Sequence, residues 1–318
     1  MAEVSWGLWR GLYWPRLSDL VSVFASDLLP IFLIAGAGFA LARWRNASAA
    51  TLTHVVFYAL LPCFAFHLLI STVATGRQFG RMVLLAVLVM ASMAIAGVLL
   101  SLAFRLSRTE AAAFLLVVMF SNGGNYGLPV VSFAFGEEAL SYGTVFFLTG
   151  SVLTNTVGAF LAAAGRRSVR SAVMSVLKIP AIYGIAAAIV VLAMGISVPT
   201  ALLRPISMLS DAALPLMILV LGMQLERAVR PSRPVLVAVA VCVSLLLAPM
   251  IALGLTSLLG VSGAARQAVV VLSSMPVAVA TTILALEFDA APDFVTSAVF
   301  LSTILSPLTL TPLIAYLR

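Results

Sequence analysis

Charged residues are scarce in this sequence. Only 9% of the 318 residues are Asp, Glu, Lys or Arg, whereas 63% are hydrophobic, and the mean hydropathy is +1.17. A soluble domain of this length carries far more charge on its surface. A bilayer removes that need, because the outside of a membrane protein faces hydrocarbon. The scarcity of charge therefore excludes a soluble globular protein and predicts an integral membrane protein.

Cysteine and histidine are also scarce, with two residues of each. Cys63 and Cys242 lie inside apolar runs, which is not the pattern of a disulfide framework. The cysteines and histidines form no metal-ligand motif, and paired carboxylates, a Ser–His pair and H-E-x-x-H are absent at usable spacing. We therefore expect no cofactor, no metal and no enzyme activity.

Long apolar runs dominate what is present. A helix needs about 20 apolar residues to cross a bilayer, and ten runs qualify. They lie near residues 28–43, 51–71, 81–104, 110–135, 138–164, 179–197, 203–225, 234–259, 264–286 and 293–316. Residues 1–27 lack such a run and are expected either to lie at the membrane interface or to form a disordered extension.

The basic residues indicate how these spans are oriented. The net charge is +7, but Lys and Arg occur in short clusters between apolar runs, which indicates topology rather than nucleic-acid binding. With the N-terminus outside, the loops expected inside hold 11 of the 18 Lys and Arg residues. The positive-inside rule then favours a cell-membrane protein, in the inner membrane if the cell is Gram-negative, with both termini outside.

The prolines indicate an internal repeat. Each half has Pro at the start of one span and inside two others, namely Pro30, Pro62 and Pro129 against Pro180, Pro215 and Pro276. Each half holds five spans, an odd number, so the second copy enters from the opposite side. We expect inverted five-helix repeats at 28–164 and 179–318, joined by a short cytoplasmic loop at 165–178. Such repeats are common in secondary transporters, although prolines are frequent in membrane helices generally.

Two segments in the middle of spans four and nine are poor helix formers. Residues 121–129 read SNGGNYGLP, and residues 273–276 read SSMP. A break at this depth must face protein or a watery cavity, and its new helix N-terminus offers free N–H groups to an anion. The predicted substrate-binding residues are those of the two breaks: Asn122, Gly123, Gly124, Asn125, Tyr126, Gly127, Pro129, Ser274, Met275, Pro276 and Val277.

Several of these residues have a structural alternative. The Asn122 and Asn125 amides suit a ligand but also suit freed backbone groups, and Tyr126 suits packing as well as a pocket wall. Asp211 and His67 are candidates for proton coupling, because ionisable groups inside a membrane are costly and usually functional. Their alternatives are an interfacial cap and a hydrogen-bonded packing residue. No arginine lies mid-span, which favours a monoanion or a ligand held by helix ends alone.

Short motifs along nearly the whole chain resemble the auxin efflux carrier family, which includes plant PIN carriers and bacterial malonate-type permeases. They are Leu29-Pro30 with Gly36-Ala-Gly38, Leu61-Pro62 with Phe66-His67, Asn122-x4-Gly127-x-Pro129, Leu214-Pro215 with Leu221-Gly222, and Met275-Pro276 with the 296–303 run. The resemblance implies ten spans, with spans four and nine crossing as broken helices in a transport domain. Spans one, two, six and seven would form a scaffold, and Asn122 would contact a substrate carboxylate.

These inferences predict an all-α membrane protein of ten helices, in two inverted five-helix repeats with crossed broken helices. The predicted function is secondary transport of a small organic anion, such as a carboxylate or an auxin-like acid, by alternating access. The expected partners are that anion and the lipid bilayer, a homodimer is left open, and nucleic acid is not expected. The alternative is an anion-binding membrane sensor on a transporter scaffold.

Overall fold

The computed structural model describes residues 16–71, 76–163, 179–226 and 233–318, and nearly all of them are helical. The first half of the chain contains α1 (Leu17–Val23), η1 (Phe24–Leu28), α2 (Leu29–Arg45), α3 (Ala49–Val55), η2 (Val56–Leu60), α4 (Leu61–Ser71), α5 (Gly76–Ala103), α6 (Arg108–Met119), η3 (Gly123–Gly127), α7 (Leu128–Leu153), η4 (Thr154–Gly158) and α8 (Ala159–Ala162). The η segments are single wider turns that continue a neighbouring helix.

The second half is also helical over its described residues. It contains α10 (Pro180–Met194), α11 (Thr200–Leu225), α12 (Pro234–Cys242), η5 (Val243–Leu247), α13 (Ala248–Leu258), α14 (Gly263–Ser273), α15 (Val279–Glu287) and α16 (Pro292–Leu317). An all-α fold is thereby confirmed over the described residues.

Seven continuous helices in the described part of the chain are long and apolar enough to cross a membrane. They are Leu17–Arg45, Ala49–Ser71, Arg77–Ala103, Gly123–Ala162, Thr200–Leu225, Pro234–Leu258 and Pro292–Leu317. The fourth has 40 residues and changes direction at Gly136, where φ is +77°, so it covers parts of two predicted spans. The remaining predicted spans correspond to shorter or interrupted helices. The protein is therefore a multi-pass membrane protein, while the count of ten and the inverted orientation stay predictions.

The first long helix begins at Leu17, so it includes residues 17–27 of the predicted N-terminal segment. The sequence hides this start because Asp27 interrupts the apolar run. In the structure the Asp27 side chain is only 3% exposed, and its carboxylate accepts a hydrogen bond from the Arg318 guanidinium at 2.5 Å. Pairing compensates the buried charge and lets the helix continue. Residues 1–15, which include most of the predicted interfacial or disordered extension, lie outside the described residues.

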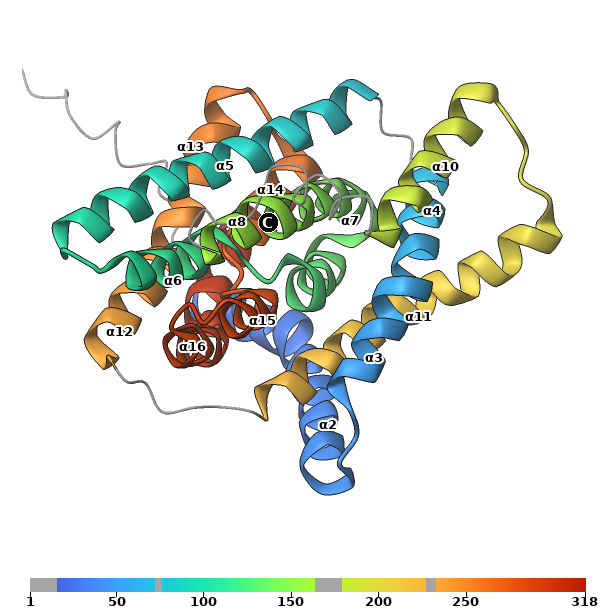
Figure 1. The fold of residues 1–318 in the computed structure, drawn as a ribbon. Helices are drawn as coiled ribbons and strands as arrows, with labels where there is room; N and C mark the ends of the chain where they lie inside the picture. Colours follow the sequence, from blue (N-terminus) through green and yellow to red (C-terminus); the bar gives the residue numbers. More distant parts are fainter. Residues whose placement is uncertain (1–15, 72–75, 164–178, 227–232) are drawn as a thin grey trace, which may run out of the picture.

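The helices form two groups (Figure 1). In the α11 group, α11 packs against α2 and α4, and α4 also packs against α10. The α7 group contains α5 to α8 and α12 to α16, with α7 packed against α14 and α5. The α11 group consists of the helices that the family resemblance assigns to a scaffold.

Glycine lets helices of the α11 group approach through their backbones. A Cβ atom on Gly222 of α11 would lie 1.7 Å from the carbonyl oxygen of Ala35 in α2, and one on Gly38 would lie 2.1 Å from that of Leu219. Small residues permit such close contacts in membrane proteins, where lipid gives no hydrophobic drive for helix association. These contacts join α2 and α11 tightly.

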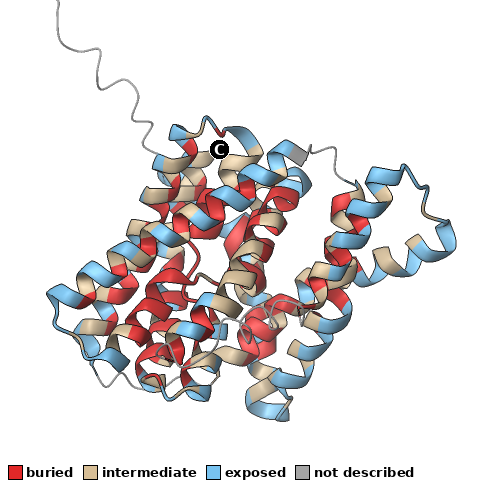
Figure 2. Ribbon diagram, turned by 45° about the horizontal axis from the view of Figure 1, so that its top comes forward, coloured by how far each residue is buried: buried red, intermediate tan, exposed pale blue. Residues whose placement is uncertain are grey.

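Buried residues concentrate on the facing sides of the helices (Figure 2). Long continuous stretches of buried residues lie on α6, over residues 112–119, and on α14, where residues 268–272 are fully buried. The outer faces carry exposed leucine, valine and isoleucine side chains, as expected for surfaces that contact lipid. The two helices that end at the breaks, α6 and α14, therefore both have long buried stretches.

Two ion pairs join helix ends that border predicted inner loops. Arg43 at the end of α2 pairs with Glu226 after α11 at 3.3 Å, and Arg233 before α12 pairs with Glu110 in α6 at 2.5 Å. Parts of three predicted inner loops are involved in these pairs. The remaining predicted inner cluster of basic residues, at 166–178, lies outside the described residues.

Candidate substrate site

The two predicted helix breaks meet and pair through their backbones. Between α6 and η3, the Asn122 N–H donates to the Pro276 carbonyl at 2.7 Å. Between α14 and α15, the Ala278 N–H donates to the Phe120 carbonyl at 2.9 Å. The pairing is antiparallel, with Ser121 opposite Val277. Each break therefore supplies hydrogen-bond partners for the other, as an interruption inside a membrane requires.

Side chains satisfy further groups at the breaks. The Ser302 hydroxyl of α16 accepts from the buried Val277 N–H at 3.1 Å, and the Ser121 hydroxyl donates to the Leu272 carbonyl at 2.9 Å. Pro276 itself has no N–H to satisfy, which makes proline suitable within an interruption. These contacts hold both breaks in one defined geometry.

The first break occupies the beginning of the segment predicted at 121–129, not its end at Pro129. The interruption covers residues 120–122, and Pro129 lies in the first turn of α7, within a helix that already begins at Gly123. Because the helix already runs through η3 before Pro129, the missing proline N–H removes one backbone hydrogen bond and leaves a carbonyl of η3 without that donor. The Gly and Asn residues, rather than Pro129, therefore decide where the helix stops.

A cavity of about 500 Å³ lies beside the paired breaks. Its wall includes the start of η3, from Asn122 to Asn125, and the start of α15, from Ala278 to Ala280. The first amides of a helix have no intrahelical acceptor, and they give its N-terminus a partial positive charge. Two helix N-termini from different halves of the chain therefore adjoin one cavity. Among the described residues that line it, none is Lys or Arg.

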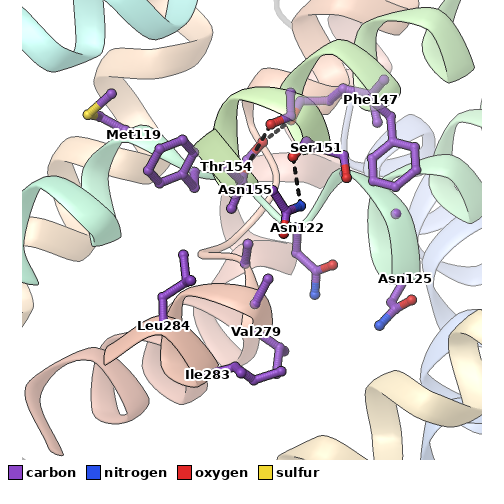
Figure 3. A pocket seen from close by; sticks show the side chains of 18 of the residues that line it. Met119, Asn122, Asn125, Phe147, Ser151, Thr154, Asn155, Val279, Ile283 and Leu284 are labelled. Atoms are coloured by element: carbon purple, nitrogen blue, oxygen red, sulfur yellow. Dashed lines mark hydrogen bonds between the residues drawn. The ribbon is translucent and has the colours of Figure 1, made fainter. Parts of the chain in front are cut away.

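Asn122 has an unsatisfied amide in this cavity. The residue is only 6% exposed, and its Nδ2 atom has no hydrogen-bond partner within the described residues. Figure 3 shows its side chain directed into the space between the α7 and α15 segments. Leaving a buried donor unpaired costs about 1–3 kcal/mol, so such a group calls for a bound acceptor. Asn125 is half-buried, and its Nδ2 donates to the Gln224 Oε1 at 3.4 Å.

Seven of the eleven predicted binding residues do not line the cavity. They are Tyr126, Gly127, Pro129, Ser274, Met275, Pro276 and Val277. Tyr126 is fully buried, and its hydroxyl accepts from Ser306 at 3.2 Å, which is the packing alternative. Gly127 keeps α7 close to α14, because a Cβ atom there would lie 2.5 Å from the Leu272 side chain. These residues support the wall, and any contact with a ligand stays a prediction.

Both proton-coupling candidates lie away from the cavity. Asp211 is exposed on α11, and His67 is half-buried on α4. Their role in coupling therefore stays a prediction without a geometric link to the site. Three other titratable residues do line the cavity, namely His54 of α3, Tyr58 of η2 and Glu287 at the end of α15.

The cavity also has lining residues that are not among the predicted ones. A polar stripe on α7 and η4 consists of Ser151, Thr154 and Asn155, and the Asn155 Nδ2 donates to the Ser151 carbonyl at 2.9 Å (Figure 3). An apolar wall consists of Met119, Phe147, Val279, Ile283 and Leu284. Asn155 could have been found from the sequence, because it is a lone amide in an apolar run. The apolar lining residues could not, because in the sequence they look the same as buried core residues.

Comparison with known proteins identifies the class. A family model described as "Membrane transport protein" matches residues 23–172 and residues 163–314. An uncharacterized transporter of Methanocaldococcus jannaschii is 26% identical over 270 residues, which cover 82% of this chain and 87% of the relative. An uncharacterized transporter of Methanothermobacter thermautotrophicus is 30% identical over 303 residues, which cover 91% and 93%.

The fold and these matches define a multi-pass membrane transporter. Within that class, the chain belongs to the membrane transport protein family, the auxin efflux carrier family that its motifs resemble.

Proposed function

We propose that this chain is a secondary transporter that carries a small organic anion, such as a carboxylate, by alternating access. One observation supports this most directly: the unpaired Asn122 amide is buried in a cavity beside two helix N-termini. A carboxylate accepts hydrogen bonds from such amides and is stabilised by the positive ends of the helices.

The strength of this site suits transport. Partial charges and neutral amides can compensate a desolvated anion without the strong attraction of a buried Arg or Lys. A transported solute must leave as well as bind, so moderate affinity is an advantage. The absence of Lys and Arg among the described lining residues also favours a substrate with one carboxylate over one with two, because a second negative charge would have no fixed cation beside it.

Alternating access requires two parts that can move relative to each other around the site. The cavity is lined from both helix groups: Phe57, Met217 and Gln224 come from the α11 group, and Asn122 and Phe147 come from the α7 group. A shift of one group against the other would therefore change access to the cavity. We propose that the α11 group is the fixed part, because its helices contact one another through their backbones.

We also propose the orientation with both termini outside, in the cell membrane. The ion pairs Arg43–Glu226 and Arg233–Glu110 support it, because each joins helix ends that border two different predicted inner loops. Lys and Arg in short loops are retained on the cytoplasmic side.

Binding and exchange in proteoliposomes test the proposal. Purified protein is screened by thermal shift against acetate, malonate and indole-3-acetate, and the stabilising compounds are then used in counterflow of labelled solute. We expect at least one carboxylate to stabilise the protein and to exchange. Binding without exchange would identify a sensor, and no binding by any of the three would remove the anion site.

Asn122→Ala is the site variant in this test, and Gln78→Ala, at an exposed position on α5 outside the cavity, is its control. We expect ligand-induced stabilisation to fall in the first and to persist in the second. Equal stabilisation of both variants would show that Asn122 does not contact the ligand.

A further inference from the structure

The wall that α11 contributes to the cavity contains one amide side chain. Met217 and Gln224 are seven residues apart on α11, which places them on the same helix face, and both line the cavity. Met217 is buried and apolar, whereas Gln224 is half-buried and polar. A polar amide among apolar residues in a membrane helix is costly unless it has a partner.

The partner of Gln224 lies on the other helix group. Its Oε1 atom accepts from the Asn125 Nδ2 at 3.4 Å, and Asn125 belongs to η3, next to the first break. The Gln224 Nε2 group has no hydrogen bond to another described residue. Gln224 therefore links the two groups through one weak bond and has two N–H donors left at the cavity surface.

The backbone of Gln224 is held firmly. Gly222, two residues earlier, contacts the backbone of α2 at Ala35, and any larger residue at Gly222 would collide with it. Gln224 is thus a donor presented by the α11 group at a fixed place, opposite the Asn122 and Asn125 amides of the α7 group.

We propose that Gln224 is a further ligand-contacting residue, whose Nε2 donates to the carboxylate that the helix N-termini hold. This inference rests on the anion site proposed above. A carboxylate has lone pairs for several donors, so it can accept from Asn122 and from Gln224 together. The bound anion would then join the two helix groups more strongly than the 3.4 Å bond between Asn125 and Gln224 does, because hydrogen bonds to a charged acceptor are stronger.

Two variants separate this role from packing. Gln224→Met keeps the length of the side chain but removes the donors, and Gln224→Glu keeps its shape but replaces the donor group with a negative charge. Gln78→Glu makes the same charge change at an exposed position outside the cavity. The probe is indole-3-acetate or malonate, whichever stabilises the wild type more, and its Kd is measured by titration calorimetry in detergent.

We expect Gln224→Met to raise the Kd about tenfold and Gln224→Glu to raise it further, since a bond to a charged group is lost and repulsion is then added. The Tm without probe should stay near that of the wild type, and Gln78→Glu should bind within about twofold of it. If Gln224 served only in packing, both variants would lower the Tm. Gln224→Glu would then have no reason to bind the probe more weakly than Gln224→Met.

A Kd for Gln224→Glu within about twofold of the wild type would overturn the inference. If Gln224→Glu does not fold, a Kd for Gln224→Met within about twofold of the wild type would overturn the inference instead. If the wild type and both Gln224 variants bind the probe while Asn122→Ala does not, the anion site stands and the role of Gln224 fails. If the wild type binds neither probe nor acetate, the proposed function fails together with this inference.

Discussion

At the residue scale, the breaks depend on a few polar groups that have no substitute nearby. Asn122 uses its backbone N–H to pair with Pro276 and leaves its side-chain amide for the cavity. Ser302 satisfies the Val277 N–H from α16. The backbone pairing and the proposed binding function are thus separate roles, which different substitutions can test.

We predict that Asn122→Asp weakens carboxylate binding more than Asn122→Ala does. Both remove the Nδ2 donor, but aspartate adds a negative charge where the ligand carboxylate would lie, and two neighbouring negative charges repel. The Kd of the best carboxylate from the thermal-shift screen is the measurement. Equal loss in the two variants would mean that the carboxylate lies elsewhere in the cavity.

We predict that Ser302→Ala lowers the free energy of unfolding by about 1–3 kcal/mol, because it leaves the buried Val277 N–H without its acceptor. Ser257→Ala, on an exposed part of α13, is the control and should change little. The measurement is the Tm of both variants in the same detergent. A Tm for Ser302→Ala equal to that of the control would show that the break does not need this bond.

At the scale of helices, close backbone contact decides which pairs stay together. α2 and α11 approach at Gly38 and Gly222, and α4 and α10 approach at Gly184, where a Cβ atom would lie 2.3 Å from the Pro62 carbonyl oxygen. The atoms in the way are backbone atoms, which cannot rotate aside as a side chain can. Adding a single methyl group must therefore separate the helices.

We predict that Gly222→Ala destabilises the protein strongly, with loss of folded protein in size-exclusion chromatography, whereas Gly36→Ala does not. A Cβ atom on Gly36 meets nothing within 4 Å, although this residue lies on the same helix as Gly38. Alanine also has the better helix propensity, by about 1 kcal/mol, so Gly36→Ala should be neutral or stabilising. A fully folded Gly222→Ala protein with an unchanged Tm would contradict the described contact of α2 and α11.

At the scale of the whole molecule, the first helix connects the two groups. Its later part packs on α11 through Gly38, while its earlier part packs on α16, where Asp27 pairs with Arg318. Arg318 also donates to the Ala134 carbonyl near the bend of α7, at 3.4 Å. A relative movement of the groups must therefore bend this helix or break the ion pair.

We predict that Arg318→Gln destabilises the protein by about 3–5 kcal/mol, because it leaves the buried Asp27 carboxylate unpaired. The double variant Asp27→Asn with Arg318→Gln should recover much of this loss, since no charge is then buried alone. Arg43→Gln, which removes a more exposed ion pair with Glu226, should cost no more than about 1 kcal/mol. A double variant as unstable as Arg318→Gln would show that burial of the charge is not the cause.

The sequence by itself determined the environment, the helical class and both interruptions. Scarce charge and long apolar runs require a bilayer, and Gly, Asn and Pro in the middle of such runs cannot form regular helix. These are local properties, which composition and order carry directly. The family also followed from local motifs, because their order along the chain is specific.

Only the tertiary structure decided which residues of the breaks line the cavity and which pack behind it. Asn122 and Tyr126 are four residues apart in one motif, yet the first adjoins the cavity and the second bonds to Ser306. Gln224 bonds to Asn125, which lies 99 positions away in the sequence, and Asp27 pairs with Arg318, which lies 291 positions away. Long-range contacts of this kind depend on how the helices pack, and no local pattern in the chain encodes them.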